Sequence, residues 1–422
     1  MSALAVFSCA GFTFVSSAFA YAPRTAGGSL LKWRSQQIVI SVSNTGSEHV
    51  SAADLENAVR KSFRKWSDAS GVEFVIKRTS ERDVSSRKSG GDGFSLVTIA
   101  PTAANMLLFE ADENNSGVTR LFFDKKGRIV EADIVLNPSA LFTVDGSRGS
   151  FDLESTLTHE AGHFLGLAHS DVRGATMYRH QGKNGVFNLP GTYPRTLASD
   201  DMAGIRHIYG SPRKGRNSFG SLSGALSNQQ FKGRDRSVWL ESASTGTVVA
   251  GVEVRANGSF SFKSLPVGDY FLIATLGDYS IINQGVGVSI EAGREKRVTV
   301  QSKRSSSPNR VRSFGFNGQI SNLAVPVEAG HRYTVYAKIN GEFSDRLRLE
   351  SGSPGISVDD ASLAFVYERK GETVVSFEIF VSAFTGRGEY AFSVYDGFSE
   401  VGYLPGVLIV DEVRNPWHSA FF

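Results

Sequence analysis

The chain has 422 residues, of which 41% are hydrophobic and 21% are charged, and its formal net charge is only +3. This length exceeds what one ordinary hydrophobic core organises, so several domains are expected. Basic and acidic residues are interspersed and nearly balanced, so the charge gives no support for nucleic acid or an anionic membrane as a partner. The 44 glycines and 30 phenylalanines are typical of a strand-rich protein with many turns.

The N-terminus has the composition of an export signal. Residues Ala3 to Ala20 are mostly apolar or small and end in Ala18-Phe19-Ala20, a pattern that signal peptidases accept. We therefore expect residues 1–20 to be removed and the protein to be secreted, with attachment to a cell surface left open. Basic residues before the apolar run are missing, so a membrane anchor and a lipid on Cys9 are the alternatives. No later stretch is apolar enough to span a bilayer, and no other cysteine is available for disulfides.

The next segment predicts strands around one long helix. Apolar residues alternate over 37–42, which predicts a strand. Ser51 is a good N-cap, and apolar residues then recur at helical spacing up to Trp66, which predicts a helix over 52–67 with Trp66 in the core. Further strands are expected over 72–76, 94–99, 118–123 and 129–136, the last two joined by a turn at 125–127.

The stretch from Thr158 to Ser170 has the spacing of a zinc site with three histidines. His159 and His163 are four residues apart, so on a helix they share one face and can bind one ion. Gly166 tolerates the left-handed conformation that ends a helix, so the chain can turn back and bring His169 to the same ion. Glu160 would take a proton from a zinc-activated water and pass it to a leaving amine, which is the chemistry of peptide hydrolysis.

This pattern, HExxHxxGxxH, fixes five positions, three of them histidines in a chain that holds only 8. Histidines satisfied within an apolar core are the alternative interpretation. A core would require neither this spacing nor the glycine, so the metal site is favoured.

The extended motif resembles that of the metzincin metallopeptidases, and its flanks resemble the matrixin branch. The resemblance covers about residues 30 to 212. It rests also on Asp152-Leu153-Glu154-Ser155, Ser170, Ala175-Thr176-Met177-Tyr178, Leu197 to Ile205 and Ile208-Tyr209-Gly210. It implies an α+β peptidase domain over residues 21–212, with a twisted mixed sheet and three main helices. It also implies one catalytic Zn²⁺, protein or peptide substrates, and Met177 as a floor below the metal that does not bind it.

The resemblance implies further roles. The strand that borders the cleft would pair with an extended substrate, and its expected peptide-binding residues are Gly117, Val118, Thr119, Arg120 and Leu121. A plain edge strand is the alternative. One of Asp200 and Asp201 should anchor the Met177 turn, and the other could accept a new N-terminus. Ser199 is expected to cap the last helix.

The loop over 179–196 should wall the main specificity pocket. Tyr178 is expected to pack beside this loop, and His180 to lie on the surface rather than bind the metal.

Two features concern other metals. No histidine lies between His49 and His159, so a second, structural zinc like that of the animal enzymes is not supported. Ca²⁺ stays open, because this part of the chain offers hard oxygen ligands, although without an ordered spacing solvated carboxylates are the preferred interpretation. These ligands are Asp92, Asp112, Glu113, Asp124 and Asp133.

The rest of the chain predicts two all-β sandwiches, over 222–301 and 313–422, with linkers at 213–221 and 302–312. The first resembles carboxypeptidase-regulatory-like sandwiches through Leu265 to Ala274, and Asn257-Gly258 predicts a hairpin within it. The second should have about seven strands. We expect these sandwiches to be spacers or to bind a surface or matrix component. The alternative function is an adhesion protein with an inactive peptidase domain, which the intact Glu160 disfavours.

Overall fold

The computed structural model describes most of the chain. It covers residues 5–8, 23–26, 29–86, 90–111, 114–186, 189, 195–210, 218–227, 235–277, 279–302, 310–316, 319–340, 345–369 and 371–410. The expected signal peptide therefore lies outside the described residues except for 5–8, and so do Cys9, Asp112 and Glu113. None of the described helices combines the length and apolarity needed to cross a bilayer.

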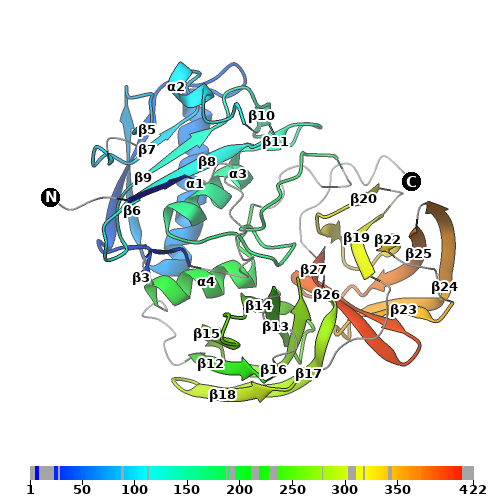
Figure 1. Ribbon diagram of the computed structural model, residues 1–422. Coiled ribbons are helices and arrows are strands. Elements are labelled where there is room, and N and C mark those ends of the chain that lie inside the picture. The colour runs from blue at the N-terminus through cyan, green and yellow to red at the C-terminus, as the bar shows by residue number, and fades with distance from the viewer. Residues whose placement is uncertain are drawn as a thin grey trace.

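The N-terminal half is built on one mixed sheet with the strand order β1-β8-β9-β7-β5-β6, and β4 pairs with β9 as well (Figure 1). Strands β5, β6, β7 and β9 run parallel, whereas β8 is antiparallel to β9 and to β1. The strands are β1 (Ala5–Ser8), β4 (Lys32–Trp33), β5 (Gln37–Ser43), β6 (Glu73–Thr79), β7 (Leu96–Thr98), β8 (Gly117–Phe123) and β9 (Arg128–Leu136). The strands expected from the alternating pattern are thereby confirmed.

Three longer helices and one short helix accompany this sheet within the described residues. They are α1 (Ala52–Ser70), α2 (Ala103–Met106), α3 (Leu153–Phe164) and α4 (Ser199–Tyr209). Helices α1 and α3 pack on each other and against the sheet, while α4 lies between this layer and the strands that follow (Figure 1). Short strand pairs join β2 (Thr25–Ala26) to β3 (Ser29–Leu30) and β10 (Phe142–Thr143) to β11 (Phe151–Asp152).

Aromatic packing fixes α3 on α1. Trp66 is fully buried, as predicted, and its indole Nε1 donates to the backbone oxygen of Thr158 at 2.8 Å. Phe63 meets Phe164 edge to face with ring centroids 5.2 Å apart, and Trp33 Nε1 donates to the oxygen of Phe164 at 2.9 Å. Aromatic pairs in such a geometry stabilise a fold more than the burial of their apolar area alone would. Core residues therefore hold α3 at Thr158 and at Phe164, on either side of His159 and His163.

The start of α4 differs from the prediction. The N-cap is Ala198 rather than Ser199, and the Ala198 N–H donates to the carboxylate of Asp201 at 2.9 Å. An acidic side chain at the third helical position can satisfy an N-terminal donor in this way, so a cap hydroxyl is unnecessary.

The C-terminal half is all-β, as expected. A three-stranded sheet β15-β12-β18 and a four-stranded sheet β14-β13-β16-β17 enclose one apolar cluster. A five-stranded sheet β20-β19-β22-β25-β24 and a four-stranded sheet β21-β27-β26-β23 enclose another. The first group comprises β12 (Phe219–Leu226), β13 (Arg236–Ser242), β14 (Val248–Glu253), β15 (Ser259–Pro266), β16 (Gly268–Leu276), β17 (Ile281–Ile290) and β18 (Glu295–Val300). The second comprises β19 (Arg310–Phe316), β20 (Gln319–Ser321), β21 (Val325–Val327), β22 (Arg332–Asn340), β23 (Leu347–Glu350), β24 (Ile356–Arg369), β25 (Glu372–Val381), β26 (Gly388–Asp396) and β27 (Ser399–Val410).

Three sequence expectations need correction here. The turn at Asn257-Gly258 forms, with the Arg255 N–H donating to the Ser259 oxygen at 2.9 Å, but it does not join a hairpin. Strand β14 pairs with β13 and β15 pairs with β12, because Val254 and Phe260 both enter the core between the two sheets. Strands β12 and β19 begin inside the segments expected to be linkers. The last region has nine described strands, β19 to β27, rather than about seven.

The all-β half packs directly on the turn that precedes Met177. Val172, Ala175 and Ala198 of the N-terminal half share a buried apolar cluster with residues of the C-terminal half, among them Trp239 and Tyr403. The approach is close, because a Cβ at Gly174 would lie 2.6 Å from Cγ of Glu389. The two halves are therefore joined by a packed interface rather than by a bare connection.

This interface contains a buried carboxyl group. Glu389 on β26 is 8% exposed and accepts a hydrogen bond from the Ser199 N–H at the start of α4. Burial raises the pKa of Glu389 to about 8, and the nearby carboxylates of Asp201 and Asp200 contribute to this increase. Glu389 is consequently protonated in the folded protein at neutral pH.

We predict that Glu389 makes the fold less stable at alkaline pH. Its folded pKa of about 8 lies above the ordinary value of 4.5, so its stabilising contribution is complete below about pH 4.5 and is lost as the pH rises through about 8. Glu389→Gln keeps the shape and removes the titration, so the melting temperature of the wild type should fall by several degrees relative to this variant between pH 5 and pH 9.

Thermal unfolding followed by circular dichroism measures this difference. The control is Glu291→Gln, an exposed glutamate in the same half, which should track the wild type at every pH. Parallel melting curves for Glu389→Gln and the wild type across that range would contradict the prediction.

Candidate metal centre and cleft

Helix α3 positions two of the three motif histidines. Asp152 caps it by accepting the Ser155 N–H at 2.8 Å, and Arg195 Nη2 donates to the same carboxylate at 2.6 Å. The helix ends at Phe164, and Gly166 has φ +98°. A Cβ at Gly166 would also lie 2.2 Å from the Leu31 oxygen, so both the conformation and the close approach require glycine. The chain turns back at this point.

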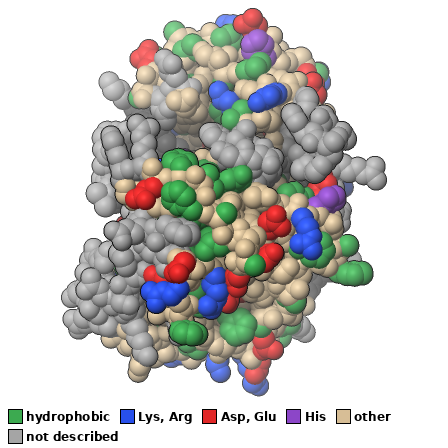
Figure 2. Space-filling view, turned by 90° about the vertical axis from the view of Figure 1, so that its right-hand side faces the viewer, with side chains coloured by type: hydrophobic (Ala, Val, Ile, Leu, Met, Phe, Trp, Pro, Cys, Tyr) green, Lys and Arg blue, Asp and Glu red, His purple; other side chains and the backbone are tan. Residues whose placement is uncertain are grey.

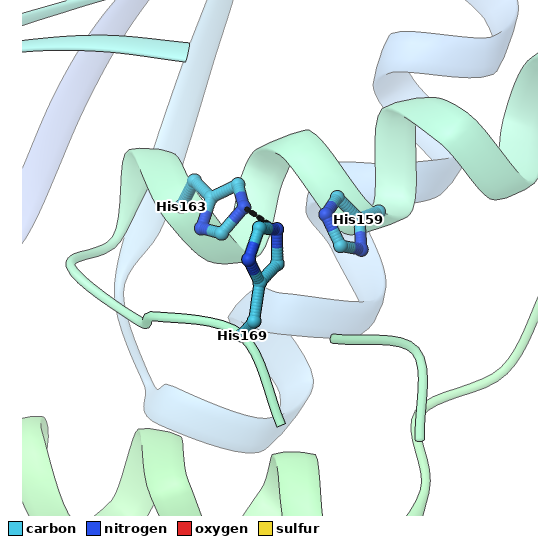
Figure 3. Close-up of side chains that lie close together, drawn as sticks. All are labelled: His159, His163 and His169. Carbon is cyan, nitrogen blue, oxygen red and sulfur yellow. Dashed lines mark hydrogen bonds between the residues drawn. The ribbon is translucent and has the colours of Figure 1, made fainter. Parts of the chain in front are cut away.

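This turn brings the three histidines together (Figure 3). His163 Nε2 and His169 Nε2 are 3.2 Å apart, and the candidate ligand atoms of all three rings lie within 4.8 Å of one another. Tetrahedral Zn²⁺ with bonds of about 2.0–2.1 Å places its ligand atoms roughly 3.3 Å apart. Within the described part of the chain, this is the one group of three or more metal-ligating side chains.

Backbone carbonyls orient two of the rings. His159 Nδ1 lies 2.7 Å from the Thr176 oxygen, and His163 Nδ1 lies 2.8 Å from the Leu167 oxygen. A carbonyl oxygen only accepts, so each Nδ1 carries the proton and each Nε2 keeps its lone pair for the centre. Burial lowers the pKa of His163 and of His169 well below the ordinary value, which keeps these rings neutral. Neutral imidazoles whose lone pairs converge fit a Zn²⁺ ion.

Glu160 lies in the same site and is 4% exposed. The Thr119 hydroxyl donates to its carboxylate at 2.5 Å. A Cβ at Gly117 would lie 2.9 Å from Glu160 Oε1, so the missing side chain leaves room for this carboxylate. Burial raises the pKa of Glu160, while His159 and the Thr119 hydrogen bond act in the opposite direction. The structure thus brings Gly117 and Thr119 to Glu160.

The other expected peptide-binding residues on β8 have different surroundings. Val118 and Leu121 are buried, and Arg120 Nη1 donates to the Ser85 oxygen at 2.7 Å. On the side of β8 away from β9, β1 pairs with residues 120–123, so Arg120 faces Ser8 and Leu121 faces Phe7. Residues 117–119 have no strand partner on that side among the described residues.

The turn at Met177 is anchored by Asp201, which confirms that one of the two aspartates has this role. Asp201 accepts the Thr176 N–H at 2.8 Å and the Met177 N–H at 3.0 Å. Asp200 accepts the Ser170 hydroxyl at 2.6 Å and the Gly251 N–H of β14 at 2.9 Å. The carboxylate that was considered for a new N-terminus is therefore bonded to the C-terminal half.

Two residues of the site were missed by sequence reasoning. Gly162 has no side chain because a Cβ there would lie 2.2 Å from Sδ of Met177, and a glycine inside a helix is the signal that could have revealed this contact. Arg24 lies beside the site, with its N–H donating to the Gly166 oxygen at 2.7 Å and its Nη2 3.2 Å from His163 Nδ1. No local pattern could have revealed Arg24, because the contact spans 139 residues.

An open cleft of about 310 Å³ passes the three histidines. It is lined by Asn114, Asn115, Ser116, Gly117, His159, Glu160, His163, His169, Tyr178, Arg179, His180 and Gln181. Tyr178 is largely buried and His180 is exposed, in agreement with the sequence expectation. The segment after Met177 thus lines the cleft together with the start of β8.

The interpretation of the acidic residues as solvated carboxylates is wrong for Asp133. This residue is 1% exposed and accepts the Ser85 N–H at 2.8 Å and the Leu96 N–H at 2.9 Å. Burial raises the pKa of Asp133 to about 7. Asp124 is instead paired with Arg128, and Asp92 accepts the Phe94 N–H at 2.8 Å. Asp133 and Asp92 therefore accept hydrogen bonds from nearby backbone N–H groups, and Asp124 forms an ion pair.

The N-terminal half of the chain is similar in sequence to known proteins. The model of the matrixin family matches residues 32–210. A hatching enzyme of Paracentrotus lividus is 29% identical over 188 residues, which are 43% of this chain and 27% of that protein. Metalloendoproteinase 1-MMP of Arabidopsis thaliana is 29% identical over 190 residues, 42% of this chain and 44% of that protein. Karilysin of Tannerella forsythia is 25% identical over 186 residues, 43% of this chain and 34% of that protein.

The chain thus spans less than half the length of each of these relatives. The matched segment includes the three histidines, Glu160, Met177 and the aspartate pair. We conclude that residues 32–210 of this chain are a domain of the matrixin family.

Proposed function

We propose that this protein is a secreted zinc metalloendopeptidase that hydrolyses peptide bonds of other proteins. The observation that carries the proposal is the convergence of His159, His163 and His169 beside the buried carboxylate of Glu160. When bound to these rings, Zn²⁺ would acidify a water molecule and polarise the scissile carbonyl. Matched proteins from a plant, Arabidopsis thaliana, and from Homo sapiens are named as metalloproteinases, which supports the same chemistry.

Glu160 is the proposed general base and then acid. Its position in the sequence, between two residues that face the centre, places its carboxylate at the edge of the cleft. The Thr119 hydroxyl holds one carboxylate oxygen, and the gap above Gly117 leaves the other oxygen accessible. Because burial raises its pKa, Glu160 is better suited to return the proton to the leaving amine than an ordinary surface carboxylate.

The unpaired edge of β8 is the proposed site for the substrate backbone. Residues 117–119 offer main-chain groups beside Glu160, and a peptide added there as a strand would run past the histidines. Arg120 and Leu121 would join this edge once residues 1–20 are removed, because β1 covers them. Met177 would support the centre by packing under α3 rather than by binding the metal.

The C-terminal half, proposed to comprise two sandwich domains, is the candidate for contact with a surface or matrix component. Phe384 and Phe398 are almost completely exposed. Figure 2 shows acidic and basic side chains interspersed over one face of the molecule, together with exposed apolar groups. Isolated exposed aromatics are suited to apolar contacts at a surface.

We expect Glu160→Gln to abolish cleavage while zinc stays bound. Loss of a general base costs roughly 10²–10⁴-fold in rate. The rate is measured with a generic peptide library, and the zinc content with mass spectrometry of the purified protein. Glu73→Gln changes an exposed glutamate of β6 and serves as the control that should keep full activity. Turnover retained in Glu160→Gln would remove this residue from the mechanism.

Zinc content provides a second test that needs no turnover. His169→Asn should lose bound zinc after dialysis, because only two imidazoles would remain at the centre. His180→Asn should keep one zinc per chain, because His180 is exposed and lies outside the cluster. Equal zinc content in the two variants would refute the assignment of His169.

A further inference from the structure

A small pocket lies beside His159 and shares Tyr178, His180 and Gln181 with the lining of the open cleft. Its volume is about 40 Å³. On one side it is bounded by the matrixin domain, through His159, Ala175 and the segment 180–182. On the other side it is bounded by Leu323 and Ala324, which lie between β20 and β21 in the all-β half. The pocket is therefore formed by parts of the chain about 150 residues apart in sequence.

Direct contacts hold this second wall in place. The Tyr178 hydroxyl donates to the backbone oxygen of Asn322 at 3.1 Å. At Gly182, a Cβ would lie 1.9 Å from Cδ1 of Leu189 and 2.7 Å from Cδ1 of Leu323. The two leucine side chains thus meet over the glycine. Ala324 is 5% exposed, so this segment is packed rather than lying loosely over the surface.

The lining favours an aliphatic side chain. Leu189, Leu323, Ala324 and Ala175 supply apolar surface. Two polar side chains around the pocket also contact residues outside it: Gln181 Nε2 donates to the Thr156 hydroxyl at 2.7 Å, and the Arg173 guanidinium lies 5.1 Å from the centre of the Tyr279 ring.

The volume sets an upper limit on that side chain. A cavity needs about 10–15 Å³ to hold one water molecule, so about 40 Å³ admits roughly three or four groups of that size. This suits leucine, isoleucine or methionine. The indole of tryptophan would require Leu189 or Leu323 to move.

We propose that Leu323, a residue of the C-terminal all-β half, limits the size of the substrate side chain that enters the pocket beside His159. The inference rests on the proposed peptidase function. The inference assigns part of the selectivity to a segment outside the matrixin domain, because the range that matches the family ends at residue 210.

The test changes the size of residue 323 in the full chain. Leu323→Ala should shift the preferred residue in cleaved peptides of a proteome-derived library from leucine toward phenylalanine and tryptophan, and Leu323→Phe should shift it toward alanine and valine. One methylene in an apolar pocket changes selectivity by about 10–200-fold, so the ratio of kcat/KM for leucine and phenylalanine substrates should change at least about tenfold. Leu363→Ala, a half-buried leucine of the same half, is the matched control and should keep the wild-type profile.

Binding is measured in parallel on zinc-loaded protein, with peptide hydroxamates that carry either an isobutyl or an indolylmethyl group. Isothermal titration calorimetry needs the pocket but no turnover. Wild type should prefer the isobutyl compound, and Leu323→Ala should reduce that preference at least about tenfold. Unchanged preference in both folded variants would overturn the inference. Absence of cleavage by the wild type would instead reject the proposed function, and the binding measurement would still decide the role of Leu323.

Discussion

The carboxylate of Asp201 is the interaction on which the rest of the site depends. It is 1% exposed and accepts three backbone N–H groups, from Ala198, Thr176 and Met177. Hydrogen bonds to a charged group each contribute about 1.5–3 kcal/mol, and a buried carboxylate without them would be costly. Thr176 in turn accepts the Nδ1–H of His159 through its own oxygen. One acidic side chain therefore connects the start of α4 to the orientation of a proposed zinc ligand.

The all-β half reaches the same group of residues by separate contacts. Gly251 donates to Asp200, and Glu389 accepts the Ser199 N–H next to it. The protonated carboxyl of Glu389 avoids adding a third negative charge beside the aspartate pair. The N-terminus of α4 provides backbone N–H donors for Asp201 and Glu389, through Ala198 and Ser199, and its dipole favours the negative charge of the aspartates. The base of the metal centre and the interface with the C-terminal half consequently share one helix end.

Local patterns predicted the parts of this molecule that depend on local geometry. Helix α1 was predicted from its N-cap and from the spacing of apolar residues, and the convergence of the three histidines was predicted from helical periodicity and one glycine. The aspartate that anchors Met177 required the resemblance to a family, since nothing in Asp200-Asp201 distinguishes the two side chains. The turn at Asn257-Gly258 shows the limit, because turn chemistry fixes a reversal of the chain but not which sheet each strand joins.

Residues that act across the fold were not predictable from the sequence. Arg24 reaches His163, Leu323 reaches Gly182, and Glu389 reaches Gly174, and none of these pairs has a sequence signal because each contact depends on how whole sheets and helices pack. The burial of Asp133 was misjudged for the same reason. A carboxylate on a strand is indistinguishable from a solvated one until the loops that supply its N–H donors are placed.

The packed interface at Val172, Ala175 and Ala198 has a consequence for how the molecule unfolds and evolves. Separate domains joined by a short connection can be exchanged or trimmed independently. Here a cut after residue 210 would expose the apolar cluster around Trp239 and would leave Asp200 without its Gly251 partner. The two halves should therefore melt as one cooperative unit, and recombination between lineages would have to exchange them together.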